Sequence, residues 1–400
     1  MIKSYAYYFA HFFIIFFLNI YIANYYLAEI FGEYQFYNTL LVLLIALSQM
    51  GTMQSFTVFA PKLKNSIKLV YATLLLRIIG YSIITLITFI IFLILDLSTL
   101  AFVFLLLFIP LTINLSSILD FYNKTIIDVK FNLIFDAVLF SIISLILIKM
   151  DLSIAYIVIA RFFTKSIAEF LKYNYIVKYI GKTKISKKYV IWMYNKSKVF
   201  ILNRIIVEMY ARSDILLLGI FGTKKQVGLY AVALAIYNGI VMGEALMARK
   251  LFPKLTKAFN NFKETKRVIT ISILYKTVYF LSAIIITLLL LNDIVFTYLY
   301  VNNEYSQSSI ILNIMLIGLF SHIFANNTNY LLMLKDKFLY IKRFLIGLVL
   351  NIILGYYFYQ KFDLEGFTLA IQIVKIVMVS YSVYLSYSYI NKKIREVNIA

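Results

Sequence analysis

The sequence predicts an all-α integral membrane protein with about 12 transmembrane helices in two pseudo-symmetric six-helix lobes. Three observations predict it. Of the 400 residues, 62% are hydrophobic and only 14% are charged, whereas a soluble chain is about half apolar and a quarter charged. Long apolar runs recur along the chain, each near the roughly 20 residues that a helix needs to cross a bilayer. Basic residues gather in alternate connections between these runs, as the positive-inside rule describes.

The predicted spans follow one another along the whole chain. They lie at about residues 5–27, 36–59, 70–95, 98–119, 131–149, 152–172, 199–221, 226–248, 268–291, 308–334, 338–359 and 365–389. The first is predicted to be a retained span and not a removed signal peptide, because its apolar run exceeds a signal core and has no clear small-residue cleavage site.

Lysine and arginine in the connections predict the topology. With the amino terminus in the cytoplasm, the inner segments hold 28 of these residues and the outer loops hold four. Such an excess is typical of cytoplasmic loops, so both termini are expected in the cytoplasm. The longest inner segment divides the chain into an amino-terminal lobe, residues 1–180, and a carboxy-terminal lobe, residues 181–400. Residues 181–198, which include Trp192, are expected to form a cytoplasmic linker or an interfacial helix.

Composition excludes several classes of function. The chain has no cysteine and two histidines, so thiolate metal sites and histidine-rich clusters are excluded, and no cofactor is expected. The net charge of +21 is explained by lysines flanking membrane spans and not by nucleic acid. The tripeptide GKT at 181–183 lacks the upstream glycine of a phosphate-binding loop, because Ile176 stands at that position. The protein is therefore expected not to be an enzyme.

The tripeptide IFG occurs at 30–32 and again at 220–222. Each copy is expected to end a span, the first and the seventh, before a short turn and a tyrosine that starts the next span, Tyr37 or Tyr230. Matching positions in the two halves are typical of transporters built from repeats.

The stretch DILLLGIFGTKKQVGLYAVA (214–233) carries a resemblance to a known family, to which LFPKL (251–255) and DLEGFTLAI (363–371) add. It is similar to the seventh-span signature of the polysaccharide (O-antigen-type) flippases of the multidrug/oligosaccharidyl-lipid/polysaccharide exporter superfamily. The matching positions are Asp214, Gly219, Gly228, Tyr230 and Ala231. One departure is in the first hairpin, where the family usually has Gly-x-Tyr and this chain has Phe36 before Tyr37 in QFY.

The resemblance implies a V-shaped, alternating-access transporter in the bacterial inner membrane. It would flip undecaprenyl-pyrophosphate-linked oligosaccharide repeat units to the outer leaflet for O-antigen (lipopolysaccharide) or capsule biosynthesis, with a polysaccharide polymerase and a chain-length regulator as further partners. Two other functions stay open. A multidrug or cation antiporter of the same superfamily would need an anionic cavity, and a repeat-unit polymerase would need larger outer loops than the short ones predicted.

Seven basic residues remain inside the predicted spans once those assigned to the connections are set aside: Arg77, Arg161, Lys165, Arg204, Arg212, Lys276 and Lys375. A cation at the bilayer centre costs about 2.5–3.5 kcal/mol, so most must face protein or a watery cavity. Five acidic residues in the spans oppose them, which leaves a surplus of two positive charges: Asp136, Glu169, Glu208, Asp214 and Glu244. Arg77, near a membrane edge, is expected to snorkel to the headgroups.

We predict two groups of site residues. Cavity residues that bind the diphosphate and the sugars are Arg161, Arg204, Lys276, Lys375, Asn326 and Asn327. Residues of a gate or of ion coupling are Arg212, Asp214, Glu208 and Glu244. An alternative stays open, in which the charges form buried ion pairs and the asparagines join helices by hydrogen bonds. The pairs would be Arg204 with Glu208, Lys165 with Glu169, and Arg212 with Asp214.

Overall fold

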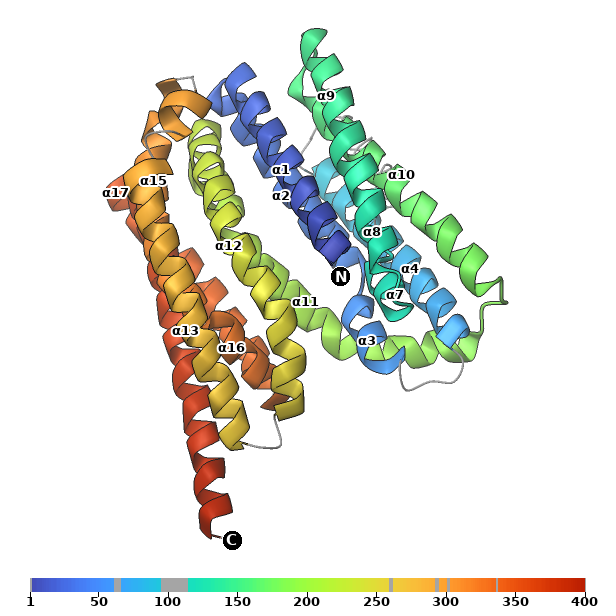
Figure 1. Cartoon of the computed structure of the whole chain (residues 1–400). Coiled ribbons are helices and arrows are strands. Elements are labelled where there is room, and N and C mark those ends of the chain that lie inside the picture. Colours follow the sequence, from blue (N-terminus) through green and yellow to red (C-terminus); the bar gives the residue numbers. More distant parts are fainter. Residues whose placement is uncertain are drawn as a thin grey trace. The chain divides into compact units, whose positions relative to one another are not determined.

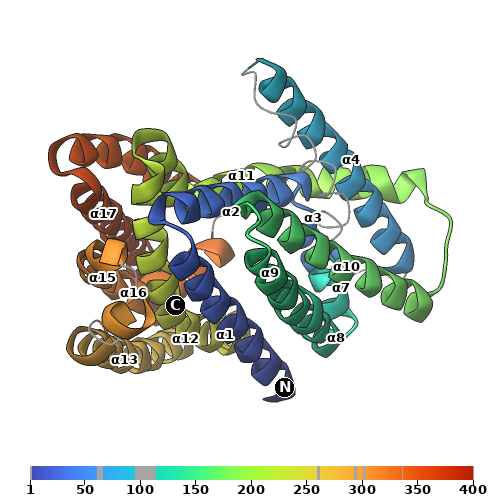
Figure 2. The ribbon, with the colours of Figure 1, turned by 90° about the horizontal axis from the view of Figure 1, so that it is seen from above.

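The computed structural model describes residues 2–60, 66–94, 114–258, 262–291, 295–300, 303–335 and 337–399, and these residues contain helices and no strand. Figures 1 and 2 show these helices from two directions. The chain packs as two compact units, each treated by itself below. The first unit is Met1–Tyr25 with Tyr37–Glu208, and the second is Tyr26–Phe36 with Met209–Ala400.

The described part of the first unit is a helical bundle that includes a π-helical segment, η2. Its elements are α1 (Ile2–Tyr25), most of α2 (Ala28–Ser48), α3 (Thr52–Phe59), α4 (Ser66–Ile94), α7 (Ser116–Phe121), α8 (Thr125–Phe131), η2 (Asn132–Leu139), α9 (Phe140–Lys149), α10 (Ile154–Ile180) and the start of α11 (Lys187–Phe221). The segment η2 packs against both α1 and α10. Polar side chains of these three elements can therefore meet inside the unit.

The second unit is built around α12. Its elements, after the start of α2 and the end of α11, are α12 (Lys224–Ala258), α13 (Phe262–Ile286), η3 (Thr287–Leu291), η4 (Val295–Leu299), η5 (Asn303–Ser306), α15 (Gln307–Ile317), α16 (Leu319–Lys335) and α17 (Lys337–Ile399). Helix α12 packs against α13, α15 and α16, and α17 packs against α15 and α16. The long α17 is two helices joined at a break, where Phe362 and Asp363 leave helical geometry.

The predicted all-α membrane class is confirmed. Eight helices of the described part are long and apolar enough to cross a membrane. Ten of the predicted spans lie almost entirely in helices, and the break at Asp363 separates the eleventh from the twelfth. The second, at 36–59, runs across the turn between α2 and α3. The fourth, at 98–119, lies mostly outside the described residues. The topology and the division at 180 and 181 stay predictions.

The expected position of the first IFG is wrong, and the difference reveals a close helix contact. Helix α1 ends at Tyr25, so residues 30–32 lie in the first turns of α2. Tyr37 and Tyr230 also lie inside helices. Gly32 is the fifth residue of α2 and Gly228 is the fifth residue of α12. The two helices start alike, and their matching glycines lie against each other.

The two glycines allow the backbones of α2 and α12 to touch. A Cβ added to Gly32 would lie 1.8 Å from the carbonyl oxygen of Lys224, and one added to Gly228 would lie 2.0 Å from that of Ala28. Small residues at such crossings are typical of membrane helices. Tyr34 and Tyr230, two residues after each glycine, are both buried. The chain therefore has a Gly-x-Tyr at 32–34, about one turn before QFY. This triplet, and not QFY, corresponds to the Gly-x-Tyr at 228–230.

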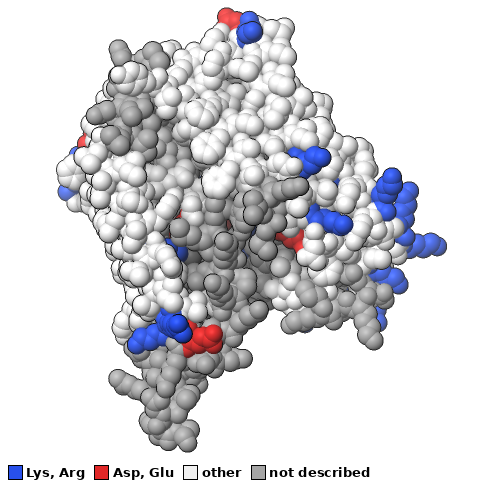
Figure 3. Space-filling model, in the orientation of Figure 1, with Lys and Arg blue, Asp and Glu red and all other residues white. Residues whose placement is uncertain are grey.

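Residues 187–198 belong to a continuous helix. Helix α11 begins at Lys187 and runs without a break into the predicted seventh span. Met193 is buried in the core of the first unit, and Ser197 lies 2.7 Å from Ser55 of α3, oxygen to oxygen. Trp192 meets Phe59 edge-on at 5.7 Å between ring centroids. Of the predicted linker, only residues 181–186 connect two helices. Figure 3 shows Lys and Arg side chains gathered at the edge where α10 and α11 join.

Candidate functional site: charges at membrane depth

A polar cluster in the first unit surrounds Asp136, which η2 places between α1 and α10. Nε2 of His11 lies 2.9 Å from one carboxylate oxygen of Asp136, and Nζ of Lys165 lies 3.9 Å from the other. The aspartate is buried. π-Helical segments are rare and recur at functional sites. The sequence did not predict η2 or the contact with His11, which is 125 residues from Asp136.

Arg161 lies beside this cluster on α10 but does not pair with it directly. Its guanidinium carbon lies 4.9 Å from the ring centroid of Phe140, and its Nε has no hydrogen-bond partner among the described residues. The charge of Asp136 acts on it electrostatically. A ring face attracts a cation less strongly than a carboxylate does. Arg161 is therefore a buried cation with capacity for a further anionic partner.

A second cluster of the first unit joins helices and is fully occupied. Lys172 is buried, and its Nζ lies 2.7 Å from Asp128, 2.7 Å from Glu169 and 2.6 Å from Asn132. Glu169 also accepts a hydrogen bond from the backbone N–H of Leu115. The predicted pair of Lys165 with Glu169 is thus wrong, because Glu169 is held by Lys172.

The expected snorkelling of Arg77 is wrong. The side chain of Arg77 is fully buried. It donates hydrogen bonds to the Thr52 hydroxyl at 2.8 Å, to the carbonyl of Asn114, and to Ser117 at 3.4 Å. These acceptors belong to α3, to α7 and to the residues just before α7, so Arg77 joins three segments of the first unit.

Arg204 forms the ion pair that the alternative interpretation predicted. Its Nη2 lies 2.8 Å from Glu208, one turn further along α11. Part of the Arg204 side chain stays accessible. The roles predicted for Arg204 and Glu208 in binding and gating stay predictions.

In the second unit, Asp214 joins α11 to α12. It accepts a hydrogen bond from the Tyr230 hydroxyl at 3.0 Å and another from the backbone N–H of Ile215 at 2.9 Å. Arg212 is half-buried on the same helix. The gate predicted for Arg212 and Asp214 stays a prediction, but the structure explains why the signature has Asp214 and Tyr230 together.

Lys375 is a cation of the second unit that faces an aromatic ring. Its Nζ lies 5.2 Å from the ring centroid of Tyr237, and it forms no ion pair with any residue that the structure describes. The charge of Asp214 acts on it electrostatically. One turn earlier on α17, Gln372 is 1% exposed, and neither atom of its amide has a partner among the described residues. The sequence had pointed to Lys375 but not to Tyr237.

Lys276 has a buried carboxylate partner. Its Nζ lies 2.8 Å from Glu244 of α12, and the other oxygen of Glu244 lies 2.7 Å from Nδ1 of His322. The His322 ring also meets the Tyr237 ring edge-on at 5.9 Å. Tyr230, Tyr237 and Glu244 are seven residues apart, so they lie along one face of α12. That spacing was available in the sequence and would have pointed to Tyr237.

The predicted asparagines divide between the described and undescribed parts. Asn327 is fully buried, and its side-chain oxygen accepts a hydrogen bond of 3.1 Å from Ser272 of α13. This contact matches the alternative in which asparagines join helices. The side chain of Asn326 lies outside the described residues. Within the described residues, no group of three or more acidic, histidine or cysteine side chains is arranged to hold a metal ion.

Two of the seven cations are held by rings and form no ion pair within the described residues. They are Arg161 over Phe140 and Lys375 over Tyr237. One belongs to the first unit and the other to the second. Arg77 differs from them, because its bonds go to neutral oxygen atoms. The surplus of two positive charges stays a prediction.

Comparison with known proteins shows the fold. No family model matches the sequence, and no curated protein matches it. Among solved structures, an inward-facing multidrug resistance MATE family transporter of the MOP superfamily is 12% identical over 96% of this chain and 95% of that one, with a TM-score of 0.76. The lipid II flippase MurJ in an inward closed conformation is 16% identical over 96% of this chain and 87% of that one, with a TM-score of 0.75.

A third structure is a MOP superfamily transporter from Pyrococcus furiosus, whose binding pocket has a reverse polarity that suggests a different function. It is 13% identical over 98% of this chain and 94% of that one, with a TM-score of 0.71. These proteins are transporters or flippases and not enzymes. At such identities the likeness shows the fold, so this chain has the fold of MOP superfamily transporters.

Proposed function

We propose that this protein flips undecaprenyl-pyrophosphate-linked oligosaccharide repeat units across the bacterial inner membrane by alternating access, in O-antigen or capsule biosynthesis. The observation that carries the proposal is the pair of ring-held cations, Arg161 and Lys375. A pyrophosphate supplies the anionic oxygens that neither residue obtains from a bonded carboxylate. The planar fork of arginine binds two phosphate oxygens at once, and lysine adds a compact charge.

The remaining predicted site residues take supporting roles in this proposal. Arg204 binds phosphate when it exchanges Glu208 for the ligand, and Lys276 acts from its pair with Glu244. Asn326 and Asn327 contact sugars. Arg212 and Asp214, with Glu208 and Glu244, form the gate or couple an ion. The chain works beside a polysaccharide polymerase and a chain-length regulator, with both termini in the cytoplasm.

Charge favours this substrate over a cationic drug. The fold accommodates both kinds of cargo, since one neighbour is a multidrug transporter and another is a lipid II flippase. In the Pyrococcus protein, too, the polarity of the pocket is connected to function. In this chain Asp136, Glu169 and Glu244 are each bound to a lysine or histidine, so few carboxylates are left to attract a cation.

The proposal is tested by replacing the two ring-held cations. At matched amounts of protein in the membrane, Arg161→Ala and Lys375→Ala should each lower surface polysaccharide at least about tenfold, because each removes a charge-assisted contact worth about 1.5–3 kcal/mol. The measurement is the yield of polymer in a strain that lacks its own flippase.

Lys361 supplies a matched control. It is exposed, lies just before the break in α17, and also faces a ring, since its Nζ lies 4.6 Å from the Tyr357 ring centroid. Lys361→Ala should leave the polymer unchanged. Equal polymer in Lys375→Ala, Arg161→Ala and Lys361→Ala would contradict the assigned roles.

A further inference from the structure

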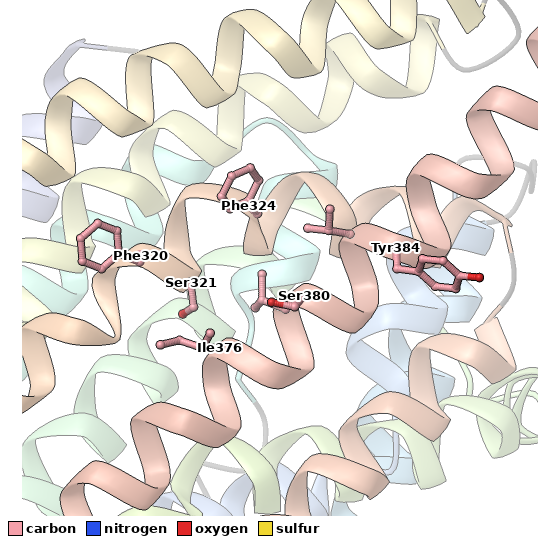
Figure 4. A pocket seen from close by; sticks show the side chains of 8 residues that line it. Phe320, Ser321, Phe324, Ile376, Ser380 and Tyr384 are labelled. Atoms are coloured by element: carbon pink, nitrogen blue, oxygen red, sulfur yellow. The ribbon is translucent and has the colours of Figure 1, made fainter.

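A groove lies between α16 and α17 in the second unit (Figure 4). Its volume is about 390 Å³, and its walls include Phe320 and Phe324 of α16 with Ile376, Val379 and Val383 of α17. In Figure 4, Ser321, Ile376 and Ser380 lie between the two helices, and Tyr384 lies at the far end. The volume is near the lower limit of small-molecule sites, which are mostly about 300–1,000 Å³. The groove is therefore large enough for part of a hydrocarbon chain.

The face of α17 that forms the groove begins with polar groups. Five residues of α17 follow the three- and four-residue spacing of a helix, so they share one face of it. They are Gln372, Lys375, Ile376, Val379 and Val383. Gln372 is buried without a partner for its amide among the described residues, and Lys375 faces the Tyr237 ring and forms no ion pair with them. The side-chain oxygen of Gln372 lies against Gly318, at the junction of α15 and α16. A Cβ added to Gly318 would be 2.0 Å from this oxygen.

The sequence of polar and then apolar groups along this face of α17 matches one kind of ligand. An unsatisfied amide and a cation come first, and branched and aromatic walls follow along the same helix face. A molecule that fits has an anionic head and a hydrocarbon chain. A single groove of this size accepts one chain, whereas a bilayer phospholipid carries two. Branched walls also suit a chain with methyl branches, because packing depends on how closely carbon atoms approach.

We propose that this groove binds the first isoprene units of the polyprenyl chain of the lipid-linked substrate while its pyrophosphate lies at Lys375 and Gln372. The inference deepens the proposed function and rests on it. Lipid tails are as apolar as the groove, so binding here gains little from the hydrophobic effect and depends on van der Waals packing. The groove then serves mainly to orient the chain, which is covalently attached to the head.

The test compares two matched variants of the protein and two ligands that carry the same pyrophosphate headgroup. Val383 lines the groove, and Val377 on the same helix is 49% exposed and does not line it. The variants are Val383→Trp and Val377→Trp, purified in nanodiscs. Undecaprenyl pyrophosphate and isopentenyl pyrophosphate are the probes. They carry the same pyrophosphate on a long and a very short chain.

Val383→Trp should bind undecaprenyl pyrophosphate about tenfold more weakly than Val377→Trp, because roughly ten carbon contacts are lost. Isopentenyl pyrophosphate should bind both variants equally. Ser380 also lines the groove and is exposed, so Ser380→Phe gives the same test if Val383→Trp does not fold.

Other outcomes separate the two proposals. If the groove variants bind the long-chain ligand as well as Val377→Trp does, the chain lies elsewhere and the inference is overturned, while the proposed function stands. Native mass spectrometry in which the groove variants lose only a copurified phospholipid would overturn it in favour of a bilayer lipid. If the unaltered protein binds neither pyrophosphate, the proposed function itself fails, and the inference fails with it.

Discussion

At the scale of single residues, the cations inside the predicted spans differ by their partners. Lys172 and Lys276 have carboxylates at 2.7–2.8 Å, whereas Arg161 and Lys375 have aromatic rings. Removing one member of a buried ion pair leaves the other charge uncompensated, while removing a cation without such a pair relieves a desolvation cost. Stability and function should therefore respond in opposite ways at the two kinds of site.

The contrast gives a prediction for two lysines of the second unit. Lys276→Met should lower the free energy of unfolding by about 3 kcal/mol, because Glu244 stays buried with only His322 as its partner. Lys375→Met should leave the thermal midpoint in detergent unchanged or raise it, while flipping is lost. A fall in midpoint for Lys375→Met as large as that for Lys276→Met would show that Lys375 is mainly structural.

The sequence predicted which charges lie at membrane depth but not most of their partners. Hydropathy places Lys375, Arg161 and Glu244 inside spans. The pairing of Glu169 depends on whether Lys165 or Lys172 turns toward it, and both lie within one turn of it on α10. Contacts between distant segments, such as that of His11 with Asp136, leave no local pattern in the sequence. Arg204 with Glu208 was predictable because its spacing lies within one helix.

At the scale of helices, two structural features explain short motifs of the sequence. Gly32 and Gly228 sit at equal positions of α2 and α12 and bring their backbones together. The DLEGF stretch contains the break in α17, where Asp363 has a φ of 53° and its carboxylate accepts a hydrogen bond of 2.6 Å from Gln226. The π-helical η2 had no such signal, because its hydrophobic pattern predicts an ordinary helix.

The glycine contact predicts a sharp response to a single methyl group. Gly228→Ala should destabilise the protein by roughly 1–3 kcal/mol, because the new Cβ would lie 2.0 Å from the Ala28 carbonyl oxygen and the helices must separate. Gly355→Ala is the milder comparison, since its Cβ would meet no backbone atom and would lie 3.2 Å from the Phe367 side chain, a contact that a small shift relieves. Thermal unfolding in detergent measures both, and equal midpoints would contradict the contact.

The double variant Gly32→Ala with Gly228→Ala refines this test. Both methyl groups would disturb the same crossing, so their effects should add to less than the sum of the single changes. Full additivity would mean that the two glycines act at independent places.

At the scale of the whole molecule, each of the two compact units contains one histidine bound to a buried carboxylate that also faces a lysine. These groups are His11, Asp136 and Lys165 in the first unit and His322, Glu244 and Lys276 in the second. Each unit also contains a cation of the predicted spans that faces a ring and forms no ion pair among the described residues, Arg161 in the first and Lys375 in the second. The class and most spans were predictable from hydropathy, since the bilayer fixes helix length. The polar contacts inside each unit were not predictable, because they depend on how the helices pack.

Transport of an anion should respond to the membrane potential. An inside-negative potential favours outward movement of a negative charge by about 2.3 kcal/mol per charge per 100 mV. We expect the rate of flipping in proteoliposomes to rise when a potassium gradient makes the inner side negative, and to fall when the gradient is reversed. A flipping rate that does not depend on the sign of the membrane potential would mean that the headgroup of the substrate crosses without net charge.

The most direct measurement is flipping of a fluorescent undecaprenyl-pyrophosphate-linked oligosaccharide by the purified protein in liposomes. The account predicts transfer between leaflets by the unaltered protein and by Lys361→Ala, with little transfer by Lys375→Ala. Absence of transfer by the unaltered protein, in liposomes where the same preparation exports a cationic drug, would contradict it.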